Sequence, residues 1–213
     1  MKLTQRIKKA LAPIGAALTV LATPALAVAD FYDGARGPSK GQVHYTLQNG
    51  NSGLALKYFG KDVFAVGVGN ANAQGPTGYF GGLGLIVEGL DRVKAIPVIG
   101  YGLSPNGKQG TAVGVAQATV FVDKDGTFLL DPRYVVKVQA HGSKDHAPQH
   151  AFGLTPSIGN AHFRIGPDVN YTPGKKPTLD ALARYDIDAQ NHSSWVQFGV
   201  GQSGAQVQVR GNF

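Results

Sequence analysis

The stretch AQVQVRGNF, residues 205–213, ends the chain and alternates between apolar and polar side chains. Successive side chains of a β-strand point to opposite faces, so this period of two residues predicts a strand with one apolar and one polar face. The apolar face would carry Ala205, Val207, Val209 and Phe213, and the polar face Gln206, Gln208, Arg210 and Asn212. A terminal strand of a soluble domain tends to fray, whereas the last strand of a closed membrane barrel pairs with the first. The stretch therefore predicts a barrel that is closed by the two ends of its chain.

This ending resembles the assembly signal of Gram-negative outer-membrane β-barrel proteins, an amphipathic last strand with a C-terminal Phe. The resemblance rests on Val207, Val209 and Phe213, and it departs at Gly211, where an apolar or aromatic residue is more usual. It implies a bacterial outer-membrane location. The partners that it implies are periplasmic chaperones, the outer-membrane assembly machinery, and the outer-membrane lipid and lipopolysaccharide around the barrel.

Residues 1–29 have the composition of a secretory signal peptide. Four basic residues precede an apolar run over 10–22, and the Ala-x-Ala sites that follow place cleavage after Ala29. The run is interrupted by proline and glycine and is shorter than the roughly 20 residues of a spanning helix, which disfavours a membrane anchor. Residues 30–41 are then a polar lead-in, and residues 42–213 form the barrel.

Charge and composition exclude several classes of protein. Removing the four basic residues of the signal lowers the formal net charge from +7 to +3, and the remaining lysines and arginines are scattered, so nucleic acid is not an expected partner. The chain has no cysteine, hence no disulfide and no thiolate metal site. No apolar run after the signal is long enough for a spanning helix. The domain can therefore cross a membrane only with strands closed into a barrel.

Residues 42–213 have the composition and periodicity of an all-β fold. Glycine makes up 30 of 213 residues, about twice the usual share of roughly 7%. We predict a closed antiparallel transmembrane β-barrel of about twelve strands, although eight or ten also fit the pattern. The expected strands cover residues 42–48, 54–58, 63–69, 79–87, 94–103, 111–122, 127–139, 151–156, 163–171, 181–189, 195–201 and 205–213. Longer connections at 70–78, 104–110 and 140–150 alternate with short ones, as in barrels with short periplasmic turns and longer outer loops.

Two features of single strands add to this pattern. Pro97 cannot donate a hydrogen bond to a ladder, which predicts a strand end or a bulge within residues 94–103. In the third to sixth strands both faces are apolar or glycine, so the pattern does not assign the inward face. Aromatic residues near strand ends are typical of the girdles at membrane interfaces. The set is Tyr58, Phe64, Tyr79, Tyr101, Phe121, Tyr134, Phe163, Tyr171, Tyr185 and Trp195.

The polar faces of the last strands carry charges that we expect to line the lumen. This charge ladder consists of Arg164, Asp168, Arg184, Asp186, Asp188 and Arg210. If 163–171 pairs with 181–189 around a connection at 172–180, Arg164 lies opposite Asp186 or Asp188, and Asp168 lies opposite Arg184. Unpaired charges in a confined interior cost several kcal/mol, so opposite charges facing each other predict a partly filled lumen with low conductance.

Histidines supply two further candidate sites. His141, His146 and His150 form the only cluster, and imidazoles suit zinc or copper, but their spacing matches no standard ligand pattern and a solvated loop is the interpretation that we prefer. His192 and Ser194 resemble the His-x-Ser pair of outer-membrane lipid A deacylases. The carboxylate partner that such a site needs is missing, since no Asp or Glu follows Asp188. We therefore expect neither a catalytic site nor a cofactor.

The sequence thus predicts an outer-membrane β-barrel with a structural envelope role or a narrow passive-channel role. Two alternatives remain open at this point. One is a membrane-embedded lipid-modifying enzyme of the lipid A deacylase kind, and the other is a soluble periplasmic β-barrel or sandwich that binds a ligand.

Removing Phe213, or replacing it with a charged residue, should impair assembly into the outer membrane more than synthesis or export, because the last strand must be recognised and must close the sheet. The measurement is the amount of heat-modifiable, folded barrel in the outer-membrane fraction, set against total exported protein. Normal amounts of folded barrel after the deletion would contradict this role of the C-terminal Phe.

Overall fold

The structure of the chain is a computed structural model that describes residues 41–60, 62–90, 92–142, 147–187 and 194–212. These residues form strands and turns. None of them belongs to a helix long and apolar enough to cross a membrane. The predicted signal peptide and nearly all of the lead-in lie outside the described residues and stay predictions.

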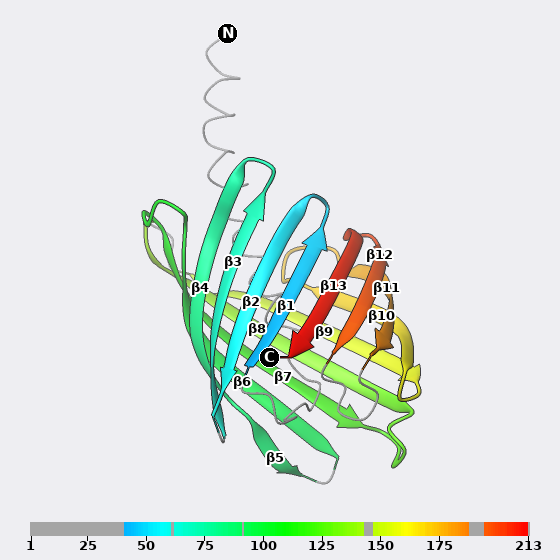
Figure 1. The fold of residues 1–213 in the computed structure, drawn as a ribbon. Coiled ribbons are helices and arrows are strands. Elements are labelled where there is room, and N and C mark those ends of the chain that lie inside the picture. Colours follow the sequence, from blue (N-terminus) through cyan, green and yellow to red (C-terminus); the bar gives the residue numbers. More distant parts are fainter. Residues whose placement is uncertain (1–40, 61, 91, 143–146, 188–193, 213) are drawn as a thin grey trace.

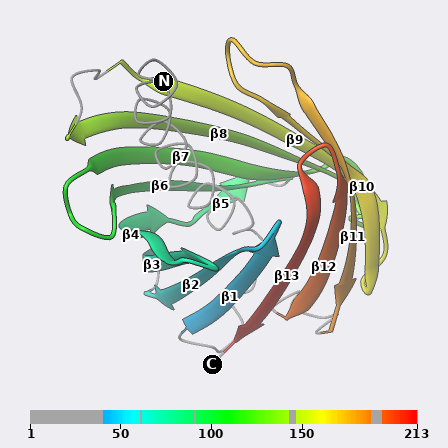
Figure 2. The same cartoon turned by 90° about the horizontal axis from the view of Figure 1, so that it is seen from above.

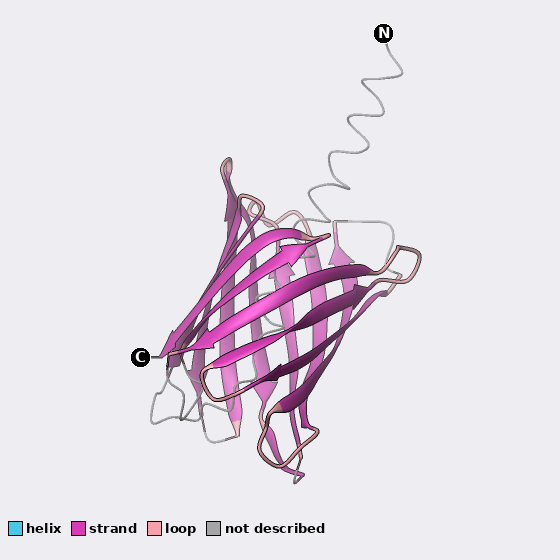
Figure 3. Cartoon of the chain, turned by 90° about the vertical axis from the view of Figure 1, so that its right-hand side faces the viewer, coloured by secondary structure: helices cyan, strands magenta, loops and turns pink. Residues whose placement is uncertain are grey.

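Thirteen antiparallel strand segments form one sheet (Figure 3). They are β1 (Gly41–Gln48), β2 (Asn51–Phe59), β3 (Val63–Asn72), β4 (Gly75–Leu85), β5 (Val87–Leu90), β6 (Val93–Leu103), β7 (Gly110–Phe121), β8 (Phe128–His141), β9 (Gln149–Gly159), β10 (Phe163–Tyr171), β11 (Thr178–Asp186), β12 (Trp195–Gly201) and β13 (Gly204–Asn212). Each pairs with its neighbour in sequence, as expected for a meander, except that β4 and β5 both pair with β6 and not with each other.

The two ends of the described chain close the sheet into a barrel. β1 pairs with β13 in antiparallel register from Gln42 opposite Asn212 to Gln48 opposite Gln206. Figure 1 shows the two strands side by side, with the C-terminus near the start of β1. The ring is completed by pairing between β4 and β6. Closure gives backbone groups at the sheet edge hydrogen-bond partners that lipid cannot supply.

β4 and β5 are a single barrel strand with an interruption at Ile86, so the barrel has the twelve strands that the sequence predicts. The N–H of Ile86 donates to the carbonyl oxygen of Asp62 at 2.9 Å, which continues the pairing of Leu85 with Val63. On β6, the pairing with β4 ends at Val98 and the pairing with β5 begins at Ala95. Pro97 lies in this gap, where its missing N–H has no ladder bond to make. The predicted strand end or bulge at Pro97 is wrong, because β6 continues through this residue without a change of register, and only the pairing on this side is interrupted.

One predicted loop is wrong. The sequence predicts a polar connection over 70–78, but β3 continues to Asn72 and β4 begins at Gly75, where φ is +120°. Polar side chains do not interrupt the pairing there, because the backbone ladder alone can hold two strands of a hairpin together. The β1–β2 turn is as tight as expected. Asn49 and Gly50 have φ of 49° and 75°, the positive values that a two-residue hairpin requires.

The outward face is apolar and the inward face of the last strands is polar. Leu83 and Ile99 point outward and are 65% and 72% exposed. On β13, Gln208 and Arg210 are buried on the inward side, whereas Val209 is exposed on the outward side, as the alternation predicts. A barrel in lipid needs this apolar outer band. The soluble periplasmic alternative does not fit an outer surface of this kind.

The predicted aromatic girdle holds for most of its members. The outward aromatic side chains that are exposed are Tyr58, Tyr79, Tyr101, Phe163, Tyr171 and Tyr185. For Phe64 and Trp195 the girdle interpretation is wrong, because both are buried on the inward face. The ring of Phe121 lies beneath the ammonium of Lys94, 5.7 Å from it. Position near a strand end does not fix the face, whereas the two-residue alternation does.

The inner faces of β3, β4, β6 and β7 form what we call the apolar wall. Its side chains are Phe64, Val66, Val68, Phe80, Ile96, Val98, Val113 and Val115. Glycines of β4 and β6 make room for its aromatic rings. A Cβ atom on Gly82 or Gly100 would meet the ring of Phe80, and one on Gly84 would meet the ring of Phe64. The two rings therefore lie against bare backbone.

Replacing Gly84 with alanine should lower the free energy of unfolding by about 1–3 kcal/mol, because the Phe64 ring must move to admit a methyl group. Gly81→Ala on the same strand is the matched control, since a Cβ there meets nothing within 4 Å. Urea unfolding of the refolded barrel in lipid vesicles measures both. Equal effects of the two substitutions would contradict the role assigned to Gly84.

Candidate functional site: the barrel lumen

The lumen has a polar wall across from the apolar wall. Its charged, amide and indole side chains come from β10 to β13. They are Arg164, Asp168, Asn170, Asp180, Arg184, Asp186, Trp195, Gln197, Gln206, Gln208 and Arg210. The strand order puts β10 to β13 on the opposite side of the ring from β3, β4, β6 and β7, which can be followed in Figure 2. We call the end where β1 begins and β13 ends the terminal end, and the other the loop end.

An ion pair joins β8 to β10 across the strand between them. The guanidinium of Arg133 contacts the carboxylate of Asp168, and its Nη2 also donates to Asn170 Oδ1 at 3.1 Å. Gly153 of β9 lies between them, and a Cβ there would lie 2.7 Å from Arg133 Nε. Asp168 also accepts hydrogen bonds from Thr155 Oγ1 at 2.5 Å and from Asn170 Nδ2 at 2.8 Å. Gly153 therefore leaves room for the side chain of Arg133 to reach Asp168. The carboxylate of Asp168 is bound by Arg133, Thr155 and Asn170.

A second cluster surrounds the indole of Trp195 near the terminal end. The guanidinium carbons of Arg184 and Arg210 lie 5.5 Å and 6.0 Å from the indole centroid, within the range of cation–π attraction. The ring of His44 on β1 meets the indole edge-on at 5.3 Å. Asp186 accepts an ion-pair contact from Arg184, with Nε 3.2 Å from Oδ1. Trp195 therefore holds two cationic side chains in place on the inner surface.

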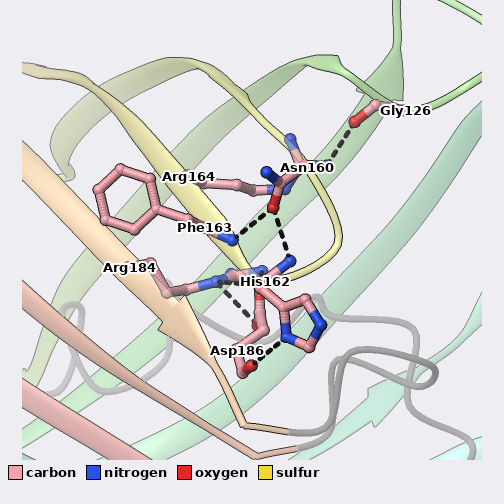
Figure 4. Close-up of polar contacts among 7 residues, drawn as sticks. All are labelled: Gly126, Asn160, His162, Phe163, Arg164, Arg184 and Asp186. Atoms are coloured by element: carbon pink, nitrogen blue, oxygen red, sulfur yellow. Dashed lines mark hydrogen bonds and ion pairs between the residues drawn. The ribbon is translucent and has the colours of Figure 1, made fainter.

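The turns at the terminal end fix the neighbouring cation. In Figure 4, Arg164 extends from β10 and donates through Nη2 to the carbonyl oxygen of Gly126 in the β7–β8 turn. Asn160 Oδ1 accepts the backbone N–H groups of His162 and Phe163, each at 2.9 Å, which orders the turn into β10. The positions of Arg164 and Arg184 are therefore set by the turns as well as by the ladder.

The predicted pairing of opposite charges across the β10–β11 hairpin is wrong. Arg164 lies opposite Arg184, and Asp168 lies opposite Asp180. The connection begins at Thr172 as predicted but ends sooner, because the N–H of Lys175 bonds back to Thr172 at 2.9 Å and β11 already starts at Thr178. The shift is by an even number of residues in each pairing, so the inward face was predicted correctly and only the partners changed.

Basic side chains outnumber acidic ones on the inner surface of the described strands. The basic ones are Lys57, Lys94, Arg133, Lys137, Arg164, Arg184 and Arg210, and the acidic ones are Asp131, Asp168, Asp180 and Asp186. Four of the basic side chains, on β2, β6 and β8, were not among the residues predicted to line the lumen. An excess of one sign inside a low-dielectric wall focuses the field on the lumen. The inner surface of the described strands therefore has a net positive charge.

Several inward polar atoms have no hydrogen-bond partner among the described residues. They include Nε2 of Gln42, Oγ1 of Thr46 and Nε1 of Trp195. Buried polar groups are normally satisfied, so groups on a lumen wall that lack protein partners are free to bind water or a solute. Most of these atoms surround the Trp195 cluster, which gives the polar wall hydrogen-bonding capacity beside its charges.

Two members of the predicted histidine cluster, His141 and His150, are described, and each binds a different tyrosine. Tyr101 and Tyr134 each bind one of its members, with O–Nδ1 distances of 2.6 Å to His141 and 2.8 Å to His150. Within the described ranges no group of three His, Cys, Asp or Glu residues could hold a metal ion. Four residues of the candidate sites lie outside the described residues, namely His146, Asp188, His192 and Phe213.

An apolar groove of about 670 Å³ lies on the outward side of the barrel. Ile158, Ile165, Ala183 and Phe198 line it with other side chains of β8 to β12. These side chains alternate with the lumen residues of the same strands, so the groove faces the membrane side.

Neither a protein-family model nor a curated protein matches the sequence. Solved structures match the fold. The KdgM porin is similar with a TM-score of 0.58 at 11% identity, covering 81% of this chain and 98% of the porin. The KdgM porin in complex with disordered oligogalacturonate gives 0.59 at 11% identity and the same coverage. The NanC porin gives 0.51 at 12% identity, covering 80% and 95%. The chain therefore has the twelve-stranded barrel fold of outer-membrane porins.

The ion pair between Arg133 and Asp168 should appear as strong coupling in a double-mutant cycle. Arg133→Gln and Asp168→Asn should each destabilise the barrel, and the double substitution should cost less than their sum by about 0.5–3 kcal/mol, because neither charge is then left alone. Urea unfolding in vesicles measures the cycle. Asp180→Asn with Arg133→Gln is the control, since Asp180 binds the backbone N–H of Ser203 instead, at 2.8 Å. Additive effects in the first cycle would contradict the pairing.

Proposed function

We propose that this protein is a passive outer-membrane channel that favours anions. The observation that carries the proposal is the basic excess on the inner surface, with Arg164, Arg184 and Arg210 gathered at the terminal end of the polar wall. A lumen of one predominant sign raises the local concentration of the opposite ion and lowers that of its own. Passage needs no bound cofactor and no moving part.

The outer surface and the fold support the same function. The apolar band with its exposed tyrosines suits lipid on all sides, and the inner polar wall suits water. The KdgM porin has been solved in complex with oligogalacturonate, which is an acidic oligosaccharide. An anionic permeant fits the excess of basic side chains in the lumen of this chain.

The route to the membrane belongs to the proposal as well. Export by residues 1–29 and recognition of Val207, Val209 and Phe213 by the assembly machinery would deliver the chain. The pairing of β13 with β1 supports the role of the last strand, because an error there would leave the sheet open. In the membrane the barrel would contact lipid and lipopolysaccharide.

A structural barrel that conducts nothing is the second candidate function. The ion pair of Arg133 with Asp168 and the hydrogen bond from Lys57 Nζ to Gln42 Oε1, at 3.5 Å, both place long side chains on the inner surface. Such contacts narrow a lumen, and twelve strands lie between small barrels filled by side chains and the wide pores of 16 to 18 strands. The two functions differ in a single measurable property, which is ion conductance.

Planar bilayers with a potassium chloride gradient separate these functions. We expect small single-channel currents and a reversal potential that corresponds to a chloride-to-potassium permeability ratio above unity. Arg164→Ser with Arg184→Ser should bring the ratio towards unity and raise the conductance, because this pair of like charges is removed from the lumen and smaller side chains replace them.

Lys175→Gln with Lys176→Gln is the matched control, since it removes the same charge from the exposed β10–β11 turn. The control should leave both quantities nearly unchanged. A cation preference of the native protein would overturn the proposed selectivity. Absence of current from correctly folded barrel would favour the structural role.

A further inference from the structure

We propose that the permeants of this channel are amphipathic organic anions, with an apolar body that lies on the apolar wall and an acidic group that faces the cations of the polar wall. The inference rests on the proposed function and adds the class of solute. The observation behind it is that the two inner walls differ in chemistry and lie across from each other, with β3, β4, β6 and β7 on one side and β10 to β13 on the other.

The apolar wall is a band at middle depth with polar residues above and below it. On β7, Val113 and Val115 lie between Thr111 towards the loop end and Gln117 towards the terminal end, all on the inward face. On β3, the inward run of Phe64, Val66 and Val68 ends at Asn70 near the loop end. A solute that enters from the loop end therefore meets polar groups first and then the apolar band.

The surface of the band is suited to a flat or linear apolar body. The ring of Phe80 lies against Gly82 and Gly100 on adjacent strands, and the ring of Phe64 lies against Gly84. Valine and isoleucine side chains fill the positions between the rings and offer no hydrogen-bonding group. A purely polar solute gains no hydrogen bond along this wall, whereas alkyl or aryl surface is removed from water there.

The opposite wall supplies the recognition of the acidic group. The guanidinium groups of Arg184 and Arg210 both lie within cation–π distance of the Trp195 indole, and Trp195 Nε1 has no hydrogen-bond partner among the described residues. Guanidinium groups bind carboxylate and sulfonate oxygens through charge-assisted hydrogen bonds. A solute with both an apolar body and an acidic head can therefore use the two walls together.

Contact with lipid does not account for the wall. Strands in a bilayer require apolar side chains only on the face towards lipid, and porin interiors are ordinarily polar. Apolar residues on both faces of β3, β4, β6 and β7 are the reason why the inward face could not be assigned from the sequence. The inward side chains pack on one another and on the glycines of β4 and β6, and they also make this side of the lumen apolar.

The probes for this inference are n-alkanesulfonates, which stay ionised and so cross the bilayer poorly without a channel. Ethanesulfonate, butanesulfonate and hexanesulfonate carry the same charge and differ only in methylene groups. Their dissociation constants come from the block of chloride current through single channels. If the apolar body lies on the wall, each added methylene should tighten binding about two- to fourfold. Galacturonate, an acidic sugar without an apolar body, should bind no more tightly than ethanesulfonate.

A set of near-isosteric substitutions tests the wall itself. Val66→Thr, Val98→Thr and Val115→Thr together should weaken hexanesulfonate about tenfold and leave ethanesulfonate and the anion preference unchanged, because only the apolar contact is altered. The matched control is Val169→Thr, Val200→Thr and Val209→Thr, all on the outward face. Heat-modifiable gel mobility checks that each barrel is folded. If the inward variant does not fold, the chain-length series on the native protein decides alone.

The outcomes separate this inference from the proposed function. An anion-selective channel that binds all alkanesulfonates equally, or that binds galacturonate more tightly than hexanesulfonate, would overturn the amphipathic permeant and leave the anion channel intact. A channel with no anion preference would overturn both. A steep dependence on chain length that is lost in the inward variant and kept in the outward control is the result that we expect.

Discussion

The pairing of β1 with β13 is the interaction on which the rest of the structure depends. A strand whose edge faces lipid leaves backbone N–H and C=O groups without partners, and each such group costs several kcal/mol. The ladder from Gln42 opposite Asn212 to Gln48 opposite Gln206 removes that cost along the whole seam. Because the seam joins the first described strand to the last, the barrel can close only when β13 is in place. Only in the closed barrel do the two faces of each strand differ in surroundings, with one face towards lipid and the other towards the lumen.

Closure also accounts for the irregular strand formed by β4 and β5. A closed ring fixes the number of strands that must pair, so a residue that cannot donate has to be accommodated within a strand. Pro97 removes one donor from β6, and the ladder to the neighbouring strand is interrupted between Val98 and Ala95 without a change of register. On the other side of that strand, the N–H of Ile86 donates to the carbonyl oxygen of Asp62 at 2.9 Å and so continues the β3–β4 pairing. The cost of the proline is thereby kept local, and the pairing of Pro97 with Ala116 on β7 stays in register.

The sequence allowed the fold class, the strand number and the faces of β10, β11 and β13 to be predicted, because in these strands charged or amide side chains alternate with apolar ones. It did not allow the inward face of β3, β4, β6 and β7 to be assigned. There the outward face is apolar because of lipid and the inward face is also apolar, so Val66 and Ala65 carry no contrast. The pattern around Lys57 could have predicted its place in the lumen, because Lys57 lies between the apolar residues Leu56 and Tyr58 on β2, but the prediction did not include it.

Contacts that skip a strand lay beyond prediction from one sequence. Arg133 reaches Asp168 only because β9 contributes Gly153 between them, and neither spacing along the chain nor the alternation of faces indicates that three-strand arrangement. The same holds for Trp195, which was expected in an interfacial girdle and lies between two arginines of the lumen instead. Long-range register, rather than local pattern, decides such contacts.

The register of the β10–β11 hairpin arranges the charges of its two strands in layers. Arg164 faces Arg184 and Asp168 faces Asp180, so each layer has one sign. Like charges directly opposite each other are unfavourable, and their compensation comes from outside the pair. Asp186 offsets Arg184 from two residues along its own strand, and Arg133 offsets Asp168 from β8.

A layered arrangement differs from the alternating ladder in its effect on a passing ion. Alternating pairs of opposite sign cancel over a few ångströms, whereas layers of one sign produce a field along the axis of the lumen. In this hairpin the acidic layer lies towards the loop end and the basic layer towards the terminal end. The turn sets which residues of the two strands face each other and therefore where the acidic layer gives way to the basic one. In this turn Gly174 has φ of +81° and the N–H of Lys175 bonds back to Thr172. A surface turn therefore determines the sign of the potential at each depth of this wall, although none of its own side chains needs to reach the lumen.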